Sequence, residues 1–109
     1  MKVIINNLER VELEEFANKH NLVMQVSERD MAGQALGMSK YTAKFKGVEV
    51  KSGATLEGAY GKGMTPEDAI KDYCSEISGE WIVVNAYGND RKLIYTPHLL
   101  PVFNMEVQE

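Results

Sequence analysis

The sequence predicts an α+β protein in which two helices cover one face of an antiparallel sheet. Apolar residues recur with helical spacing at residues 8–20 and 65–79, and five shorter segments alternate apolar and polar residues as half-buried strands do. The resulting order, α-β-β-β-α-β-β, buries both apolar helix stripes most economically in a two-layer sandwich. The 109 residues form one domain, 1–109, because no shift in composition marks a boundary and a chain of this length builds one modest core.

The first helix is predicted at residues 8–20, where Asn7 is the expected N-cap and Asn21 the expected left-handed stop. Its apolar face consists of four residues at the spacing i, i+3, i+4 and i+7: Leu13, Phe16, Ala17 and His20. A strand at 22–29 follows the helix. Residues 30–38 contain two glycines and no periodicity, so we expect a flexible loop there.

The second strand begins with a strict alternation at residues 40–46. Its core-facing residues are Tyr41, Ala43 and Phe45. The alternation shifts by one residue at Gly47, which predicts a β-bulge there, and a tight turn at 46–47 is the alternative. A third strand at about 54–60 completes the expected meander.

The second helix, at residues 65–79, has the clearest local signals in the chain. Thr65 is the expected N-cap, Pro66 takes the first helical position, and Asp68 completes a capping box. Gly79 is expected to end the helix in the left-handed conformation. The apolar stripe of this helix contains five residues: Ala69, Ile70, Tyr73, Cys74 and Ile77.

A C-terminal hairpin is predicted at residues 80–96, from two aliphatic strands joined by a turn at 87–90. Its aromatic residues are Trp81, Tyr87 and Tyr95. We expect them either to extend the core or to form the apolar patch of a homodimer. Residues 97–109 are expected to be an irregular tail whose apolar side chains pack against the body.

Residues 8–79 resemble a double-stranded-RNA-binding domain in the order α-β-β-β-α and in the length of each element. The glycine-rich segment 58–63, which leads into Thr65, stands where that family has a strand end and the start of its second helix. The resemblance implies the family's two-layer fold, whereas a shared topology does not carry function.

Residues 58–95 also resemble small phage and prophage proteins, a group with no assigned function. The matching residues are Gly61-x-Gly63-x-Thr65-Pro66-Glu67-Asp68-Ala69-Ile70, then Tyr73, Ile77-Ser78-Gly79 and Asn85-Ala86-Tyr87. This resemblance implies a phage or mobile-element origin.

The charges argue against duplex RNA as a partner. Double-stranded-RNA-binding domains hold phosphates with lysines at the start of their second helix, whereas this chain has Glu67 and Asp68 there. Sixteen acidic residues against twelve basic ones leave a net charge of −4, which disfavours wholesale binding to phosphate backbones.

No catalytic, cofactor-binding or metal-binding residues are predicted. Cys74 lies on an apolar helix stripe, which suits a small buried side chain better than a nucleophile. His20 and His98 have no second ligand near them in the sequence. The glycine pattern over 58–63 is neither a dinucleotide-binding motif nor a P-loop, so we expect a close approach of two backbone segments there. Whether a small ligand binds near residues 58–65 is left open by the sequence.

The expected location is the cytoplasm, with no membrane partner. The single cysteine cannot form an internal disulfide, and no apolar run approaches the roughly 20 residues that span a bilayer.

The expected function is therefore that of a non-catalytic binding module without a cofactor, which engages a host or phage protein. The resemblance to phage proteins implies inhibition of a host defence system as one form of this function. The expected protein-binding residues are acids of the two helices: Glu9, Glu12, Glu15, Glu67, Asp68, Asp72 and Glu76. The alternative is a nucleic-acid-binding protein that uses the lysines of the strand at 40–51: Lys40, Lys44, Lys46 and Lys51.

Overall fold

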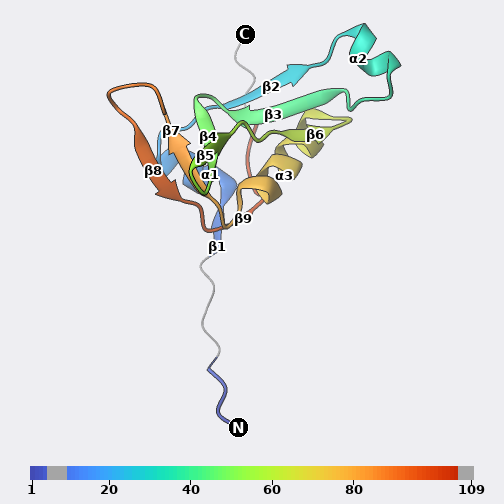
Figure 1. Cartoon of the computed structure of the whole chain (residues 1–109). Coiled ribbons are helices and arrows are strands. Elements are labelled where there is room, and N and C mark those ends of the chain that lie inside the picture. Colours follow the sequence, from blue (N-terminus) through green and yellow to red (C-terminus); the bar gives the residue numbers. More distant parts are fainter. Residues whose placement is uncertain (5–9, 106–109) are drawn as a thin grey trace.

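The computed structural model describes residues 1–4 and 10–105, and it has the α+β class that the sequence predicts (Figure 1). The described residues form three helices and nine strands, and the strands make three separate hydrogen-bonded sheets. A single meander covered by both helices is therefore not the architecture of this chain.

The three-stranded antiparallel sheet has the order β2-β3-β6. Its strands are β2 (Met24–Glu28), β3 (Tyr41–Phe45) and β6 (Gly61–Gly63). Met24 pairs with Phe45 and Val26 with Ala43, so these residues share one face of the sheet. Ala43 and Phe45 are buried on that face, which confirms the predicted alternation in this strand.

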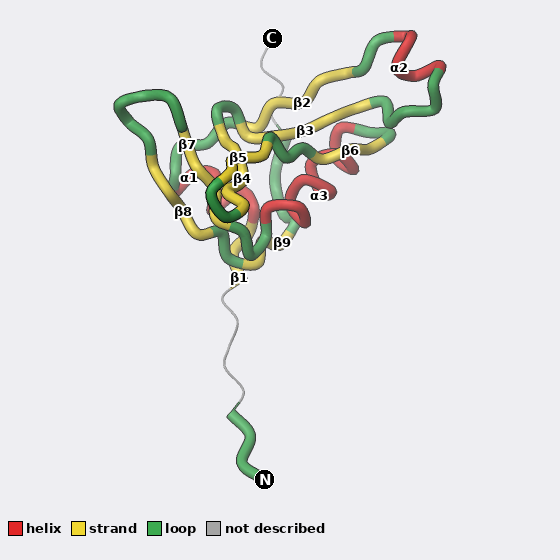
Figure 2. The backbone as a smooth tube through the Cα atoms, viewed as in Figure 1, coloured by secondary structure: helices red, strands yellow, loops and turns green. Residues whose placement is uncertain are grey.

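A short helix, α2 (Met31–Ala35), lies at the far end of the β2–β3 pair, away from the other helices (Figure 2). The expectation of a loop without secondary structure at 30–38 is therefore wrong. The side-chain amide of Gln34 donates to the Arg29 carbonyl at 2.8 Å and fixes this helix against the end of β2.

The four-stranded antiparallel sheet has the order β5-β4-β7-β8. Its strands are β5 (Thr55–Glu57), β4 (Val48–Ser52), β7 (Trp81–Val84) and β8 (Lys92–Tyr95). The predicted C-terminal hairpin is confirmed as β7–β8, and it joins this sheet through the pairing of β7 with β4.

The predicted bulge at Gly47 is wrong, and the alternative of a tight turn at 46–47 is correct. Gly47 has a φ of +71°, and its carbonyl accepts a hydrogen bond from the Asn85 amide at 2.9 Å. This bond holds the start of β4 beside the end of β7. The chain thus leaves the three-stranded sheet at the turn and enters the four-stranded sheet, so the segment 40–51 is two strands.

The two ends of the domain meet in a parallel pair, β1 (Arg10–Glu12) with β9 (His98–Leu100). The prediction of an irregular tail from residue 97 is therefore wrong, although the predicted packing is confirmed because Leu99 is buried. The Leu99 amide donates a hydrogen bond to the Ser78 hydroxyl at 3.0 Å. The Cys74 thiol donates to the Leu99 carbonyl oxygen at 3.4 Å.

The first helix, α1 (Leu13–Lys19), begins later than predicted because residues 10–12 pair with β9. Glu12 is the residue at its N-cap, and the predicted cap Asn7 lies outside the described residues. The predicted left-handed stop is confirmed, since Asn21 has a φ of +54°.

The last helix, α3 (Pro66–Ile77), matches its prediction closely. The Thr65 hydroxyl accepts the amide hydrogen of Asp68 at 3.1 Å, Pro66 opens the helix, and Gly79 has a φ of +77°. The five residues of the predicted apolar stripe are all buried.

Phe45 joins the two longer helices to one core. Its ring is fully buried, 6.4 Å from the Phe16 ring of α1 and 5.5 Å from the Tyr73 ring of α3 between centroids. Val48 and Ile82 of the four-stranded sheet belong to the same cluster of buried residues. The sheets therefore share a single core, and their outer faces are left for other contacts.

Candidate functional site

The outer face of the four-stranded sheet carries apolar side chains. Directly paired residues share a face, and the register pairs Trp81 with Tyr95 and Val83 with Leu93. Ile82, between Trp81 and Val83, is directed to the core and fully buried. We call the opposite set the apolar sheet face, which consists of five residues: Leu56, Trp81, Val83, Leu93 and Tyr95.

Three of these side chains are about half exposed: Trp81 at 47%, Leu93 at 49% and Tyr95 at 53%. Val83 is fully buried, yet it does not belong to the core cluster. Beside it on the outer face, the Trp81 and Tyr95 rings pack edge to face with their centroids 5.3 Å apart. The apolar sheet face is thus a small second cluster that water still reaches.

One acid and one base of β4 lie within this face, where Lys51 stands between Leu56 of β5 and Trp81 of β7. Glu49 pairs with Val83 and Lys51 with Trp81, so both side chains of β4 point to this same face. The third aromatic residue of the hairpin, Tyr87, is 91% exposed in the turn and lies outside the sheet register. The sequence thus identified two residues of this face, Trp81 and Tyr95, and left Leu56, Val83 and Leu93 out.

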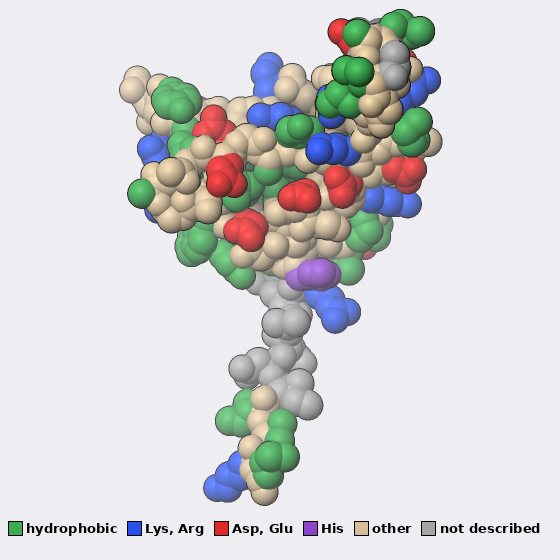
Figure 3. All heavy atoms as spheres, turned by 45° about the vertical axis from the view of Figure 1, so that its right-hand side comes forward, with side chains coloured by type: hydrophobic (Ala, Val, Ile, Leu, Met, Phe, Trp, Pro, Cys, Tyr) green, Lys and Arg blue, Asp and Glu red, His purple; other side chains and the backbone are tan. Residues whose placement is uncertain are grey.

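The acids predicted to bind protein lie on two helices that pack against different strands. α3 carries Glu67, Asp68, Asp72 and Glu76 and packs against β6 and β3. The helix α1 packs against β1 and β9 and carries Glu15, which is exposed. Glu12 is the last residue of β1, at the N-cap of α1, and Glu9 lies outside the described residues. Figure 3 shows many acidic side chains on the side of the molecule that carries α3 and β6.

One of these acids already has a structural role. The Asp72 carboxylate accepts the Lys62 backbone amide at 2.8 Å and holds β6 to α3.

The lysines of the alternative hypothesis do not form one surface. Lys40 pairs with Glu28 at 3.8 Å, and its ammonium group lies 5.4 Å from the centre of the Tyr41 ring. Lys44 is half-buried on the outer face of β3, Lys46 is exposed in the turn, and Lys51 belongs to the other sheet. Only Lys44 therefore keeps the position that the hypothesis requires of all four.

Two side chains that could be reactive, Cys74 and His20, are packed against apolar neighbours. Burial raises the pKa of the Cys74 thiol to about 11, which keeps it protonated and poorly nucleophilic at neutral pH. Burial, together with Lys19 and Lys92, lowers the pKa of His20, whose ring packs 4.7 Å from that of Phe16. Within residues 1–4 and 10–105, no three His, Cys, Asp or Glu residues come together as metal ligands would.

The glycines before α3 permit close packing of backbone on backbone. A Cβ at Gly61 or Gly63 would collide with the backbone of α3, at Ala69 and Tyr73 or at Asp68 and Ala69. The predicted close approach is therefore confirmed. The helix backbone fills the space beside these two glycines, whereas Gly58 lies in the open.

The helices in the described ranges are all too short or too polar to traverse a lipid bilayer. Compared with protein-family models, with curated proteins and with solved structures, the chain matches none of them.

Proposed function

We propose that this chain is a non-catalytic protein-binding module that docks on its partner through the apolar sheet face. The observation that carries the proposal is the cluster around Val83, which forms outside the core and leaves Trp81, Leu93 and Tyr95 half exposed. Apolar patches of this kind on small proteins mark sites of interaction.

The composition of the face favours a protein as the partner. Trp and Tyr are enriched among the residues that dominate the binding energy of protein interfaces, and such residues cluster near the centre of the interface. Here both aromatic rings stand on adjacent strands of a rigid sheet, so little conformational freedom is lost when they are covered.

Charge favours a partner that is basic around an apolar centre. The chain has a net charge of −4, and α3 carries four acids against Lys71 alone. Two copies of so acidic a chain repel one another, whereas a basic partner is attracted and steered towards it. The resemblance to phage proteins supports a more specific proposal, in which the partner is a host protein and binding inhibits its action in defence.

The experiment places a photo-cross-linking amino acid at position 93, inside the apolar sheet face, and at position 89, in the exposed turn. We expect a specific product from position 93 in bacterial cells and none from position 89. The captured protein is then purified and its affinity measured. Trp81→Ala should weaken binding at least tenfold, as loss of an interface anchor does, while Tyr87→Ala should leave it within about twofold.

Two results would overturn this proposal. Equal cross-linking from both positions would show that the face has no preference for a partner. Sedimentation that reveals a dimer of the purified chain, lost in Trp81→Ala, would assign the apolar sheet face to a second copy instead.

A further inference from the structure

The outer face of the β2-β3-β6 sheet is hollowed by a cavity of about 360 Å³. Its lining residues of interest are Gln25, Ser27, Arg29, Thr42, Lys44 and Tyr60. They point away from the core because their neighbours in β2 and β3, such as Met24 and Phe45, occupy the opposite face. The volume lies within the range of small-ligand sites.

The floor of this cavity has a cation at each end. Lys44 pairs with Gln25 at one end, Ser27 pairs with Thr42 in the middle, and Arg29 follows the end of β2. Gln25 and Arg29 are four residues apart on an extended chain, which is a separation of about 13 Å. The hydroxyl groups of Ser27 and Thr42 therefore stand between the two cations, and the Gln25 amide lies beside Lys44.

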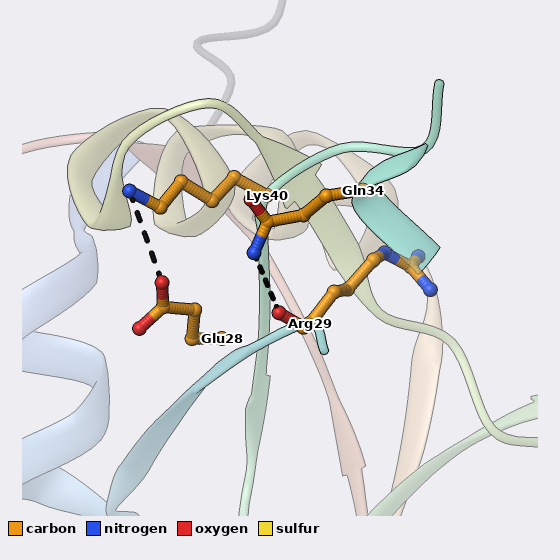
Figure 4. A network of polar contacts seen from close by, with 4 residues as sticks. All are labelled: Glu28, Arg29, Gln34 and Lys40. Atoms are coloured by element: carbon orange, nitrogen blue, oxygen red, sulfur yellow. Dashed lines mark hydrogen bonds and ion pairs between the residues drawn. The ribbon is translucent and has the colours of Figure 1, made fainter. Parts of the chain in front are cut away.

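In the part of the chain that the structure describes, no acid lines this cavity. Arg29 has an acid on either side of it in the sequence, Glu28 and Asp30. The Glu28 carboxylate leaves the strand in the opposite direction from Arg29 and binds Lys40 (Figure 4). The Nε of Arg29 is buried and has no hydrogen-bond acceptor within residues 1–4 and 10–105. A lining with two cations and no acid among the described residues contrasts with the net charge of −4 of the whole chain and favours an anionic ligand.

An aromatic ring and a third cation lie at the margin of the cavity. Tyr60 is 42% exposed, and the Lys62 ammonium group lies 5.4 Å from the centre of its ring. Lys62 pairs with Thr42, so its side chain extends the polar row of the floor onto β6.

We propose that this cavity binds the phosphate groups of a nucleotide, with its base against Tyr60. Arg29 and Lys44 would hold the phosphate oxygens from both ends, because Arg and Lys supply charged donors that suit phosphate. Ser27, Thr42 and Gln25 would donate or accept hydrogen bonds between them. The ring of Tyr60 offers an apolar surface on which any base can stack. The same chemistry occurs in a free nucleotide and in a single strand of nucleic acid.

The experiment is a calorimetric titration of the purified chain in about 50 mM salt. Four probes are used: ATP, AMP, inorganic phosphate and an oligothymidylate of twelve nucleotides. We expect binding of at least one nucleotide-bearing probe. Lys44→Ala should weaken it about tenfold, the loss of one charge-assisted contact, and Lys44→Arg should retain it. Lys51→Ala is the matched control, since it removes the same charge from the outer face of the other sheet, and it should change the affinity less than twofold.

Two further comparisons decide the details. Tyr60→Ala should weaken binding and Tyr60→Phe should not, because stacking needs the ring and not the hydroxyl. Tighter binding of the oligothymidylate than of ATP, with a steep dependence on salt, supports a single strand as the source of the phosphate. Tighter binding of ATP supports a free nucleotide.

Three outcomes would overturn the proposal. The first is no binding of any nucleotide-bearing probe at millimolar concentration. The second is an equal loss of affinity in Lys51→Ala and Lys44→Ala. The third is binding of inorganic phosphate as tight as that of ATP, which would leave no part for the base. All three outcomes are read from the affinity for nucleotides and phosphate and not from the binding of a protein, so this proposal fails or stands independently of the proposed function.

Discussion

At Gly61, the absence of a side chain lets β6 approach α3. A Cβ at this position would overlap the Ala69 carbonyl oxygen and the Tyr73 amide nitrogen, which are helix backbone and cannot turn aside. We expect Gly61→Ala to lower the free energy of unfolding by about 3 kcal/mol, measured by urea denaturation. Gly58→Ala is the control, because a Cβ there meets no atom within 4 Å. Equal destabilisation by the two changes would contradict this explanation.

Two neighbouring residues of α3, Tyr73 and Cys74, make stability depend on alkaline pH. Burial raises the pKa of Cys74 from 9.0 to about 11 and that of Tyr73 from 10.0 to about 12. The unfolded chain therefore loses these protons first, and the unfolded state gains stability as the pH rises. The contribution of both groups is complete below about pH 9 and is lost as the pH rises to about 12.

We expect Cys74→Ala to remove the earlier part of that loss, between about pH 9 and 11. The measurement is the free energy of unfolding in urea at a series of pH values, with each variant compared with its own value at pH 8. This comparison cancels the loss of unfolding free energy that the smaller side chain causes at every pH. A variant that loses stability in parallel with the wild type over this interval would show that the thiol does not contribute.

At the level of elements, the N-terminus of α3 depends on one hydroxyl group. The Thr65 side chain accepts the amide hydrogen of Asp68, which the helix itself leaves unpaired. Thr65→Ala should lower the free energy of unfolding by about 1 kcal/mol, and Thr65→Ser should restore most of it. Denaturation of the three proteins under one condition is the measurement, and a Ser variant as unstable as the Ala variant would refute the role of the cap.

The elements that the sequence predicted well are those whose signals are local. The start, the stripe and the end of α3 are all encoded within residues 65–79, and the β7–β8 hairpin likewise needs only its own turn. The parallel pair β1–β9 joins residues about ninety positions apart, for which no local pattern exists. The turn at 46–47 that divides residues 40–51 between two sheets is joined to Asn85 by a hydrogen bond to the Gly47 carbonyl, and no local pattern at Gly47 announces that distant partner.

The candidate site was predictable only in part for a related reason. The aromatic residues Trp81 and Tyr95 stood out by type, whereas Val83 and Leu93 look like ordinary core residues of a strand. A signal was present, since β7 and β8 are apolar at both alternating positions, as strands covered on both faces are. Lys51 was assigned to the same strand as Lys44 because the whole segment was assumed to lie in one sheet, whereas it belongs to β4 of the other sheet.

For the whole molecule, the two proposed surfaces belong to different sheets that share one core. The sheets meet at the 46–47 turn, beside a cavity of about 420 Å³ lined by Lys44 and Val48 among others. Glu49 and Asp90 also line this cavity, so it lacks the excess of positive charge of the cavity beside it. Recognition of a protein and of a phosphate can thus coexist on one small chain, because the charges that serve each are kept apart.

The shared core should make the two sheets unfold as one unit. Phe45 contacts Phe16 and Tyr73 from the three-stranded sheet, and the same cluster includes Ile82 of the four-stranded sheet. Phe45→Leu should therefore lower amide-exchange protection in β3 and in β7 by the same free energy, about 1 to 2 kcal/mol.

The control for this experiment is Val23→Ala, because Val23 is 63% exposed and its loss should change protection by less than about 0.5 kcal/mol. Exchange is followed residue by residue in deuterated buffer. If Phe45→Leu reduced protection in β3 and left β7 unchanged, the sheets would be separate cooperative units. In that case a ligand bound to the outer face of one sheet would stabilise that sheet alone, whereas a single unit transmits the stabilisation to both.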